Sequence, residues 1–214
     1  MTARIILCAL LLSLPLHADG VETAIGVSFG PTSRGASSSH GDTTTGLQVR
    51  VGWDESWSHI QMDQWQALAQ TGSNHDLTYA TAGAGWQHSW WTESHRAQAA
   101  LGAELRVEHY QGRDTLASGT SPLNAEQAWM VRPWLRAQAG FRGILFPFLP
   151  GEAFNFLAWL TEGGTYTHPF TRLEVAVPLS HRGGEDPRGT LLQMAPRWEA
   201  SVQFGMRFGC HTPR

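Results

Sequence analysis

A recurring alternation of apolar and polar residues, tryptophans at the ends of the alternating segments and a low charge content together predict the fold class of this 214-residue chain. Charged residues make up 15% of the sequence, whereas an ordinary soluble domain has about 25%. The sequence has a single long apolar run, which excludes a bundle of membrane-spanning helices. We predict an all-β fold, a closed antiparallel transmembrane β-barrel of about eight to ten strands with long outer loops and short periplasmic turns.

The first 18 residues have the pattern of a secretory signal peptide. Arg4 supplies a positive charge, Ile5–Leu16 is apolar, and Leu16-His17-Ala18 ends on a small residue. Cleavage is therefore expected after Ala18. The predicted organisation is a signal peptide over 1–18, a barrel over 19–208 and a C-terminal tail over 209–214. One cysteine, Cys210, would remain in the mature chain, so no internal disulfide is expected.

Eight segments of the mature chain are predicted to be strands. Six of them alternate closely between apolar and polar or small residues, namely 21–30, 47–53, 97–108, 129–139, 172–179 and 197–208. Two weaker segments lie near 57–69 and 75–88. Such strands fit a soluble sandwich with a buried apolar face, or a barrel whose apolar face meets lipid. The polar positions mix Arg and Glu with Gly, Ser, Gln and Ala, which suits a narrow lumen and favours the barrel.

The stretch Phe141–Gly164 leaves the number of strands open. As one connection it gives eight strands and a very long periplasmic turn, with room for an interfacial helix at Glu152–Leu160. As two strands, near 142–149 and 152–161, it gives ten strands and restores the alternation of long and short connections. Pro147 counts against the first of these strands, because proline cannot donate a ladder hydrogen bond. The loop pattern nevertheless favours ten.

Tryptophan positions and loop lengths support the membrane interpretation. Aromatic rings at strand ends are typical of a membrane–water interface, and seven tryptophans are so placed: Trp53, Trp57, Trp86, Trp90, Trp91, Trp129 and Trp198. Trp65, Trp134 and Trp159 fit no such position and suit ordinary packing. The expected connections are long at Pro31–Asp42, Gln111–Asn124 and Ser180–Pro196, medium at Gln70–Asn74, and short at Asp54–Ser56 and Thr92–His95. This alternation is typical of barrels whose two termini face the periplasm.

The leader Met1–Ala18, the strand-end tryptophans and the last strand, Trp198–Phe208, resemble those of small bacterial outer-membrane β-barrel proteins. In that family the final strand commonly closes on an aromatic residue that the barrel-assembly machinery reads, and Phe204, Met206 and Phe208 match this signal. The resemblance implies a location in the cell outer membrane and contact with outer-membrane lipid and lipopolysaccharide. It also implies the barrel-assembly machinery as a partner during biogenesis, and it identifies no subfamily. An extracellular or periplasmic protein partner is a further option.

No pattern of ligand spacing predicts a metal site, a cofactor or a catalytic group. The ten histidines form no HxH, HxxxH or HExxH pair, and a net charge of −3 provides no basic surface for nucleic acid. An enzymatic alternative is a lipid A acyl hydrolase, for which Glu108, His109, Ser118 and Ser121 are the nearest candidates. The His-x-Ser arrangement associated with those hydrolases is missing, so a non-enzymatic role is favoured.

Charged residues at inward positions could line a narrow solute pore or pair to fill the lumen. They are Arg50, Arg96, Glu104, Arg106, Glu108, Arg132, Arg136, Arg172, Glu174, Glu199 and Arg207. A barrel of this size has little interior space beyond its own side chains, and charges confined there must be paired or hydrated. The sequence therefore favours a structural or surface-interaction barrel with a largely plugged lumen and outward-facing loops.

Two predictions concern the register of neighbouring strands. An antiparallel hairpin of 96–109 and 125–139 should place Glu104 almost opposite Arg132, with both on the inward face. If the sheet closes, the first strand must pair with the last. Glu22 and Arg207 should then face one another at the periplasmic rim.

Overall fold

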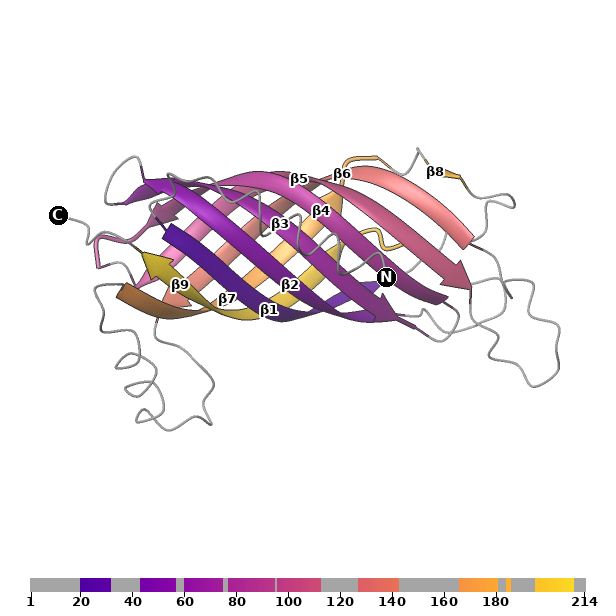
Figure 1. Ribbon diagram of the computed structural model, residues 1–214, viewed down its shortest axis with the longest axis horizontal. Helices are drawn as coiled ribbons and strands as arrows, with labels where there is room; N and C mark the ends of the chain where they lie inside the picture. Colours follow the sequence, from indigo (N-terminus) through magenta and orange to yellow (C-terminus); the bar gives the residue numbers. More distant parts are fainter. Residues whose placement is uncertain are drawn as a thin grey trace, which may run out of the picture.

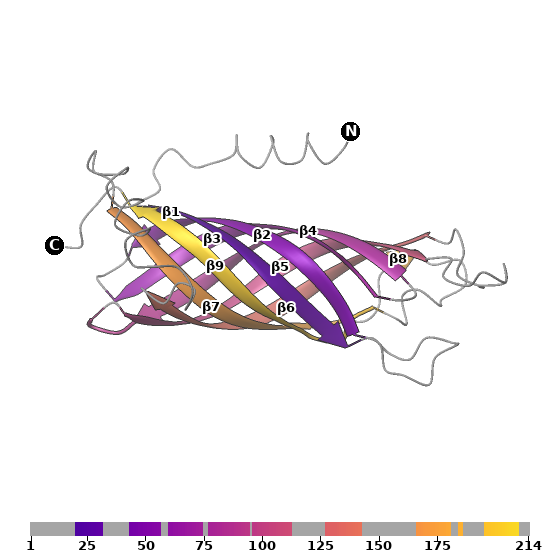
Figure 2. The same ribbon diagram turned by 90° about the horizontal axis from the view of Figure 1, so that it is seen from below.

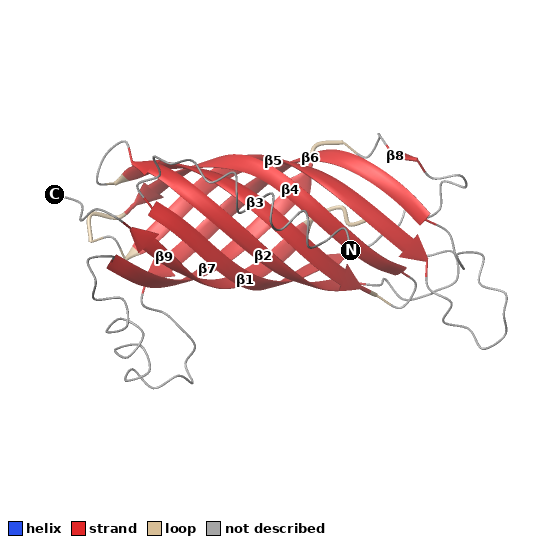
Figure 3. Ribbon diagram, viewed as in Figure 1, coloured by secondary structure: helices blue, strands red, loops and turns tan. Residues whose placement is uncertain are grey.

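The computed structural model describes residues 20–31, 43–56, 60–74, 77–94, 96–112, 127–142, 166–180, 184–185 and 195–209. All of its regular elements are β-strands (Figure 3). They are β1 (Gly20–Pro31), β2 (Thr43–Ser56), β3 (Gln61–Ser73), β4 (Leu77–Trp91), β5 (Ala97–Gly112), β6 (Gln127–Arg142), β7 (Tyr166–Pro178), the short β8 (Gly184–Glu185) and β9 (Glu199–Gly209). Within these ranges no helix has the length and apolar character needed to cross a membrane.

Eight long strands form a single closed antiparallel sheet (Figure 1). Each strand from β1 to β7 pairs with the next along the chain, β7 pairs with β9, and β9 pairs with β1. The two-residue β8 extends the sheet beside the start of β6. Glu22 lies opposite Arg207, which confirms the predicted closure and its register. Closure matters because it leaves no strand edge without hydrogen-bond partners.

The barrel has eight long strands, so the expectation of ten is wrong. β6 pairs directly with β7, from Arg142 opposite Phe170 to Trp134 opposite Pro178. This pairing leaves no place in the sheet for two more strands between them. Residues 143–165 lie outside the described residues, so the helix considered for Glu152–Leu160 stays untested.

Several strands are longer than the alternation of residues indicates. β2 includes Asp54–Ser56 and β3 extends to Ser73, because cross-strand pairing continues through both segments. Conversely, β3 begins at Gln61 rather than near residue 57. β7 begins at Tyr166, since its first residues pair with β9 beyond the point where β6 ends.

β1 begins and β9 ends at the same end of the barrel, here called the termini end (Figures 1 and 2). The opposite end is called the far end. Connections at the far end span 32–42, 74–76, 113–126 and 179–198, and those at the termini end span 57–60, 92–96 and 143–165. Long connections therefore lie mainly at the far end and short ones mainly at the termini end, as the predicted alternation of lengths requires, with 143–165 as the long exception and 74–76 as the short one.

The exterior of the barrel is apolar and its interior is polar. Ile25, Leu47 and Leu101 point outward and are 64%, 61% and 57% exposed. Gln203 and Arg132 point into the lumen and are fully buried. A soluble protein has the opposite distribution, whereas a barrel embedded in lipid has this one. The single closed sheet and its two faces therefore exclude the soluble sandwich.

Exposed aromatic side chains lie on the exterior toward both ends of the barrel. Near the termini end, Trp53 lies opposite Trp65, and Trp65 lies opposite Trp86, so three consecutive strands carry one row of tryptophans. The expectation of ordinary packing is wrong for Trp65, which belongs to this exposed row. At the far end the exposed rings are Phe29, Trp129 and Trp198. Trp134 is different because it is buried in the lumen, and Trp57 and Trp159 lie outside the described residues.

Candidate functional site in the barrel lumen

Twelve charged side chains of the described strands point into the lumen, and each belongs to an ion pair. Six are arginines and six are carboxylates, so this set has no net charge. The arginines are Arg50, Arg106, Arg132, Arg136, Arg172 and Arg207, and the carboxylates are Glu22, Asp54, Glu104, Glu108, Glu174 and Glu199. Pairing of this kind compensates for the large desolvation penalty of burying each charge.

The central part of this network joins strands that are not neighbours in the sheet. Arg50 of β2 donates to Glu104 of β5 over 2.7 Å and to Glu174 of β7 over 2.7 Å. Arg136 of β6 lies 3.6 Å from Glu104 and 3.5 Å from Glu174. Since other strands separate β2 from both β5 and β7, these ion pairs cross the lumen. Arg106 connects this group to Glu199 of β9, because it donates to both Glu104 and Glu199.

A second group, nearer the far end, is centred on Glu108. Arg132 donates to this carboxylate through Nη2 over 2.6 Å and through Nε over 3.1 Å. Trp134 Nε1 and the Tyr110 hydroxyl also donate to it, over 2.7 and 2.5 Å. The Trp134 ring lies 4.1 Å from the guanidinium carbon of Arg106 and 4.7 Å from that of Arg132. These are cation–π distances, so the indole joins the two groups of the network.

The prediction that Glu104 lies opposite Arg132 is wrong. Arg132 does point into the lumen, as expected, but it lies opposite Arg106, and Glu104 lies opposite Trp134. The hairpin is therefore shifted by two residues from the expected register. A shift of two keeps every side chain on its face and changes only its cross-strand neighbour.

At the termini end, the expected contact between Glu22 and Arg207 is replaced by two other pairs. Glu22 pairs with Arg172 over 2.5 Å, and Arg207 pairs with Asp54. The sequence placed Asp54 in a turn, so its role in the lumen was missed. Arg96, predicted to point inward, is exposed in the turn before β5 and is not a lumen residue.

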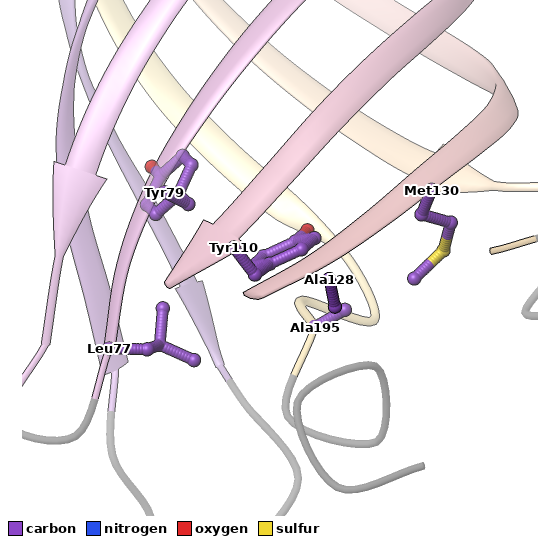
Figure 4. Packing of buried hydrophobic residues seen from close by; sticks show 6 residues of the cluster. All are labelled: Leu77, Tyr79, Tyr110, Ala128, Met130 and Ala195. Carbon is purple, nitrogen blue, oxygen red and sulfur yellow. The ribbon is translucent and has the colours of Figure 1, made fainter. Parts of the chain in front are cut away.

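Apolar side chains fill the lumen at its far end (Figure 4). The cluster comprises Leu77, Tyr79, Tyr110, Ala128, Met130 and Ala195, all nearly inaccessible to solvent. Ala195 comes from the segment that precedes β9, and the next residue, Pro196, accepts a hydrogen bond from Arg132 over 3.1 Å. The backbone N–H of Arg197 donates a hydrogen bond to the carbonyl oxygen of Pro31 over 3.4 Å. Strand alternation gives no signal for a loop segment that enters the barrel, so sequence reasoning missed this contact.

The candidate hydrolase residues do not form a catalytic pair among the described residues. Glu108 points into the lumen, whereas His109 points outward and its ring lies 4.3 Å from that of Trp129. Ser118 and Ser121 lie outside the described residues. The described part of the chain also contains no cluster of three His, Cys, Asp or Glu residues suited to a metal ion.

Comparison with protein-family models and with curated proteins found no match. Among solved structures, the chain is similar to Neisserial surface protein A, with 11% identity, a TM-score of 0.47 and coverage of 89% of this chain and 97% of that one. It is also similar to Ail, the attachment invasion locus protein of Yersinia pestis, with 6% identity, a TM-score of 0.44 and coverage of 90% and 99%. A third similar structure is the translocator domain of the autotransporter NalP from Neisseria meningitidis, with 8% identity, a TM-score of 0.39 and coverage of 98% of this chain and 95% of that one.

These similarities are distant, and the membrane assignment of this chain rests on its own apolar exterior. The closed eight-stranded antiparallel barrel confirms the architecture that the resemblance to small outer-membrane barrels implied.

Proposed function

We propose that this chain is an integral barrel of the bacterial outer membrane with a structural or surface-interaction role, and that its own side chains plug the lumen. The observation that carries the proposal is the paired network of lumen charges beneath the apolar cluster at the far end. An eight-stranded barrel is just wide enough inside for its side chains. A solute path would need lumen charges open to water, whereas Arg50, Arg106 and Arg132 are at most 2% exposed.

The length of the strands supports insertion across a bilayer. The long strands contain 11 to 16 residues, and a tilted strand needs about 9–11 residues to cross the hydrocarbon core. In the proposed orientation the termini end faces the periplasm, after export by the leader Met1–Ala18. The far end then presents its longer connections to the outside. Loops held on a rigid scaffold are common binding elements, so a surface partner would meet residues 32–42, 113–126 and 179–198.

The proposed partners follow from this location. The exterior would contact outer-membrane lipid and lipopolysaccharide, and the last strand, which ends with Phe204, Met206 and Phe208, would be read by the barrel-assembly machinery. An extracellular or periplasmic protein partner remains part of the proposal.

Cell fractionation combined with planar-bilayer recordings tests the proposal. We expect the mature protein in the outer-membrane fraction, released only by detergent, and no steady conductance after reconstitution. Trp134→Ala removes the largest fully buried side chain among the described residues and should increase ion conductance. Trp129→Ala, which removes an exterior tryptophan of the same strand, should remain silent and serves as the matched control.

Three results would contradict parts of this proposal. Recovery of the protein in the soluble periplasm would reject membrane insertion. Steady conductance of the unmodified protein would reject the plug and favour the narrow pore. Altered lipid A in cells that overproduce the protein would support the hydrolase alternative instead.

A further inference from the structure

The exterior of β3 and β4 carries a hydrogen-bonded polar pair near the termini end. Asp63 and His88 lie directly opposite each other, and His88 Nδ1 is 2.6 Å from Asp63 Oδ1. Their side chains are 17% and 25% exposed. Because the neighbouring residues Met62 and Gln64 point into the lumen and are buried, Asp63 is on the outward face. If the barrel is inserted as proposed above, this pair faces lipid.

Three exposed tryptophans surround the pair on the same face. Trp65 and Trp86 lie opposite each other, two residues nearer the middle of the barrel, and Trp90 lies two residues beyond His88. The exposed fractions of these tryptophans are 52%, 38% and 41%. The His88 ring packs edge-on against Trp90 with centroids 4.6 Å apart, and it lies 6.3 Å from Trp86. A carboxylate and an imidazole are thus held within an open aromatic frame.

The position of the Asp63–His88 pair along the strands determines which layer of the membrane it contacts. Asp63 is two residues from the start of β3, and His88 is three residues from the end of β4. The tryptophan row is closer to the barrel centre, at the level where aromatic belts mark the edge of the hydrocarbon. The pair is therefore at the level of the phospholipid headgroups, where a polar side chain on the exterior carries little penalty.

We propose that Asp63, His88 and the surrounding tryptophans form a binding site for the headgroup of phosphatidylethanolamine in the leaflet at the termini end. This inference rests on the proposed membrane insertion. The primary ammonium donates hydrogen bonds to Asp63, a charge-assisted contact. The tryptophan faces add cation–π attraction to the same ammonium. When its ring is doubly protonated, His88 donates Nδ1–H to Asp63 and Nε2–H to the adjacent phosphate.

The chemistry of the site separates ethanolamine from other headgroups. A choline headgroup is attracted by the aromatic rings but has no N–H to donate to the carboxylate. A glycerol headgroup has no positive charge for either the rings or Asp63. The site therefore predicts the order ethanolamine, then choline, then glycerol.

Native mass spectrometry of the full mature protein can test this order. The protein is inserted into lipid nanodiscs that contain equal amounts of phosphatidylethanolamine, phosphatidylcholine and phosphatidylglycerol with the same acyl chains. After release, we expect retained ethanolamine lipid to exceed glycerol lipid by about fivefold, corresponding to roughly 1 kcal/mol. Asp63→Asn should abolish the preference over choline, and Trp90→Leu should reduce the retention of both ammonium lipids.

His109→Gln is the matched control, because His109 also packs on a tryptophan but lies at the far end. It should retain lipid like the unmodified protein. The difference in electrophoretic mobility between unheated and heated samples verifies that each variant is folded. An undiminished ethanolamine preference in Asp63→Asn would overturn the site. Insertion without any lipid preference would overturn this inference alone, whereas failure to enter the nanodiscs would overturn the proposed function.

Discussion

Arg132 illustrates, at the scale of one residue, how this barrel accommodates a buried charge. Its guanidinium donates to the Glu108 carboxylate, to the Tyr110 hydroxyl over 3.2 Å and to the Pro196 carbonyl oxygen over 3.1 Å. The side chain is fully buried. A fully buried guanidinium is stable only if its N–H groups find hydrogen-bond acceptors and a carboxylate supplies the opposite charge. The same requirement makes each member of the network sensitive to loss of its partner.

Replacing Arg132 with Met should therefore destabilise the barrel by about 3–5 kcal/mol, because it leaves the Glu108 carboxylate without its counter-charge. Adding Glu108→Gln should recover part of that loss, since the uncompensated charge is then removed. Urea unfolding in lipid vesicles, followed by tryptophan fluorescence, measures the free energy of unfolding of each variant. Arg96→Met, at an exposed arginine in a turn, should change it by less than about 0.5 kcal/mol. A double variant no more stable than Arg132→Met would show that the pair does not act as a unit.

At the scale of the strands, an aromatic side chain of one strand packs closely against glycines of its neighbours. Tyr79 of β4 points into the lumen and packs over the glycines of β2 and β3. A Cβ atom added to Gly72 would lie 2.5 Å from the Thr45 carbonyl oxygen and 2.6 Å from the Tyr79 ring. Gln70 donates to the Tyr79 hydroxyl over 2.9 Å, which holds the ring in place. Glycine is thus required at residue 72 by packing, because the contacting atoms include backbone.

Gly72→Ala should destabilise the barrel by about 1–3 kcal/mol through overpacking. Gly140→Ala is a matched control in another lumen-facing position, where the nearest atom to a new Cβ is the Gln98 side-chain oxygen at 3.2 Å. That side chain can shift by a few tenths of an ångström, so the control should be nearly neutral. Thermal unfolding in detergent micelles compares the two variants. Equal midpoints would contradict the close packing of Tyr79 on the glycine.

The reversed distribution of polar and apolar residues is a property of the whole molecule. An apolar exterior is stable only when lipid, or another apolar medium, covers it. Leu105 lies midway along β5 and is 54% exposed, whereas Gln111 is exposed near the far end of the same strand. The two positions point to the same face but lie at different depths.

Leu105→Arg should destabilise the protein in lipid vesicles by about 2–4 kcal/mol, and Gln111→Arg by about 0–1 kcal/mol, because the penalty for a charge depends on its depth in the bilayer. Reversible unfolding from the vesicles measures both values. In a water-exposed barrel, Leu105→Arg would be neutral or favourable. Equal effects of the two substitutions would therefore argue against the proposed span.

Much of the fold could be predicted from the sequence because side-chain direction in a strand depends only on neighbouring residues. The alternation correctly placed Ile25 outside and Arg132 inside, since successive residues of a strand point to opposite faces. The pairing of the first strand with the last also followed, because a barrel in lipid cannot leave an edge unpaired. The lumen charges were identified in the same way, with Asp54 missed and Arg96 wrongly included.

The sequence by itself thus determined the fold class and the two faces of the sheet, which depend on local alternation, and the closure of the barrel, which follows because lipid leaves no partner for an unpaired strand edge. Only the tertiary structure decided the partners within the lumen. Glu104 meets Arg50 of a non-adjacent strand rather than Arg132, and Ala195 enters the far end from a loop. These contacts depend on strand register and on packing between residues far apart in the chain. Because a shift of two residues preserves the alternation, the sequence pattern is the same for either register.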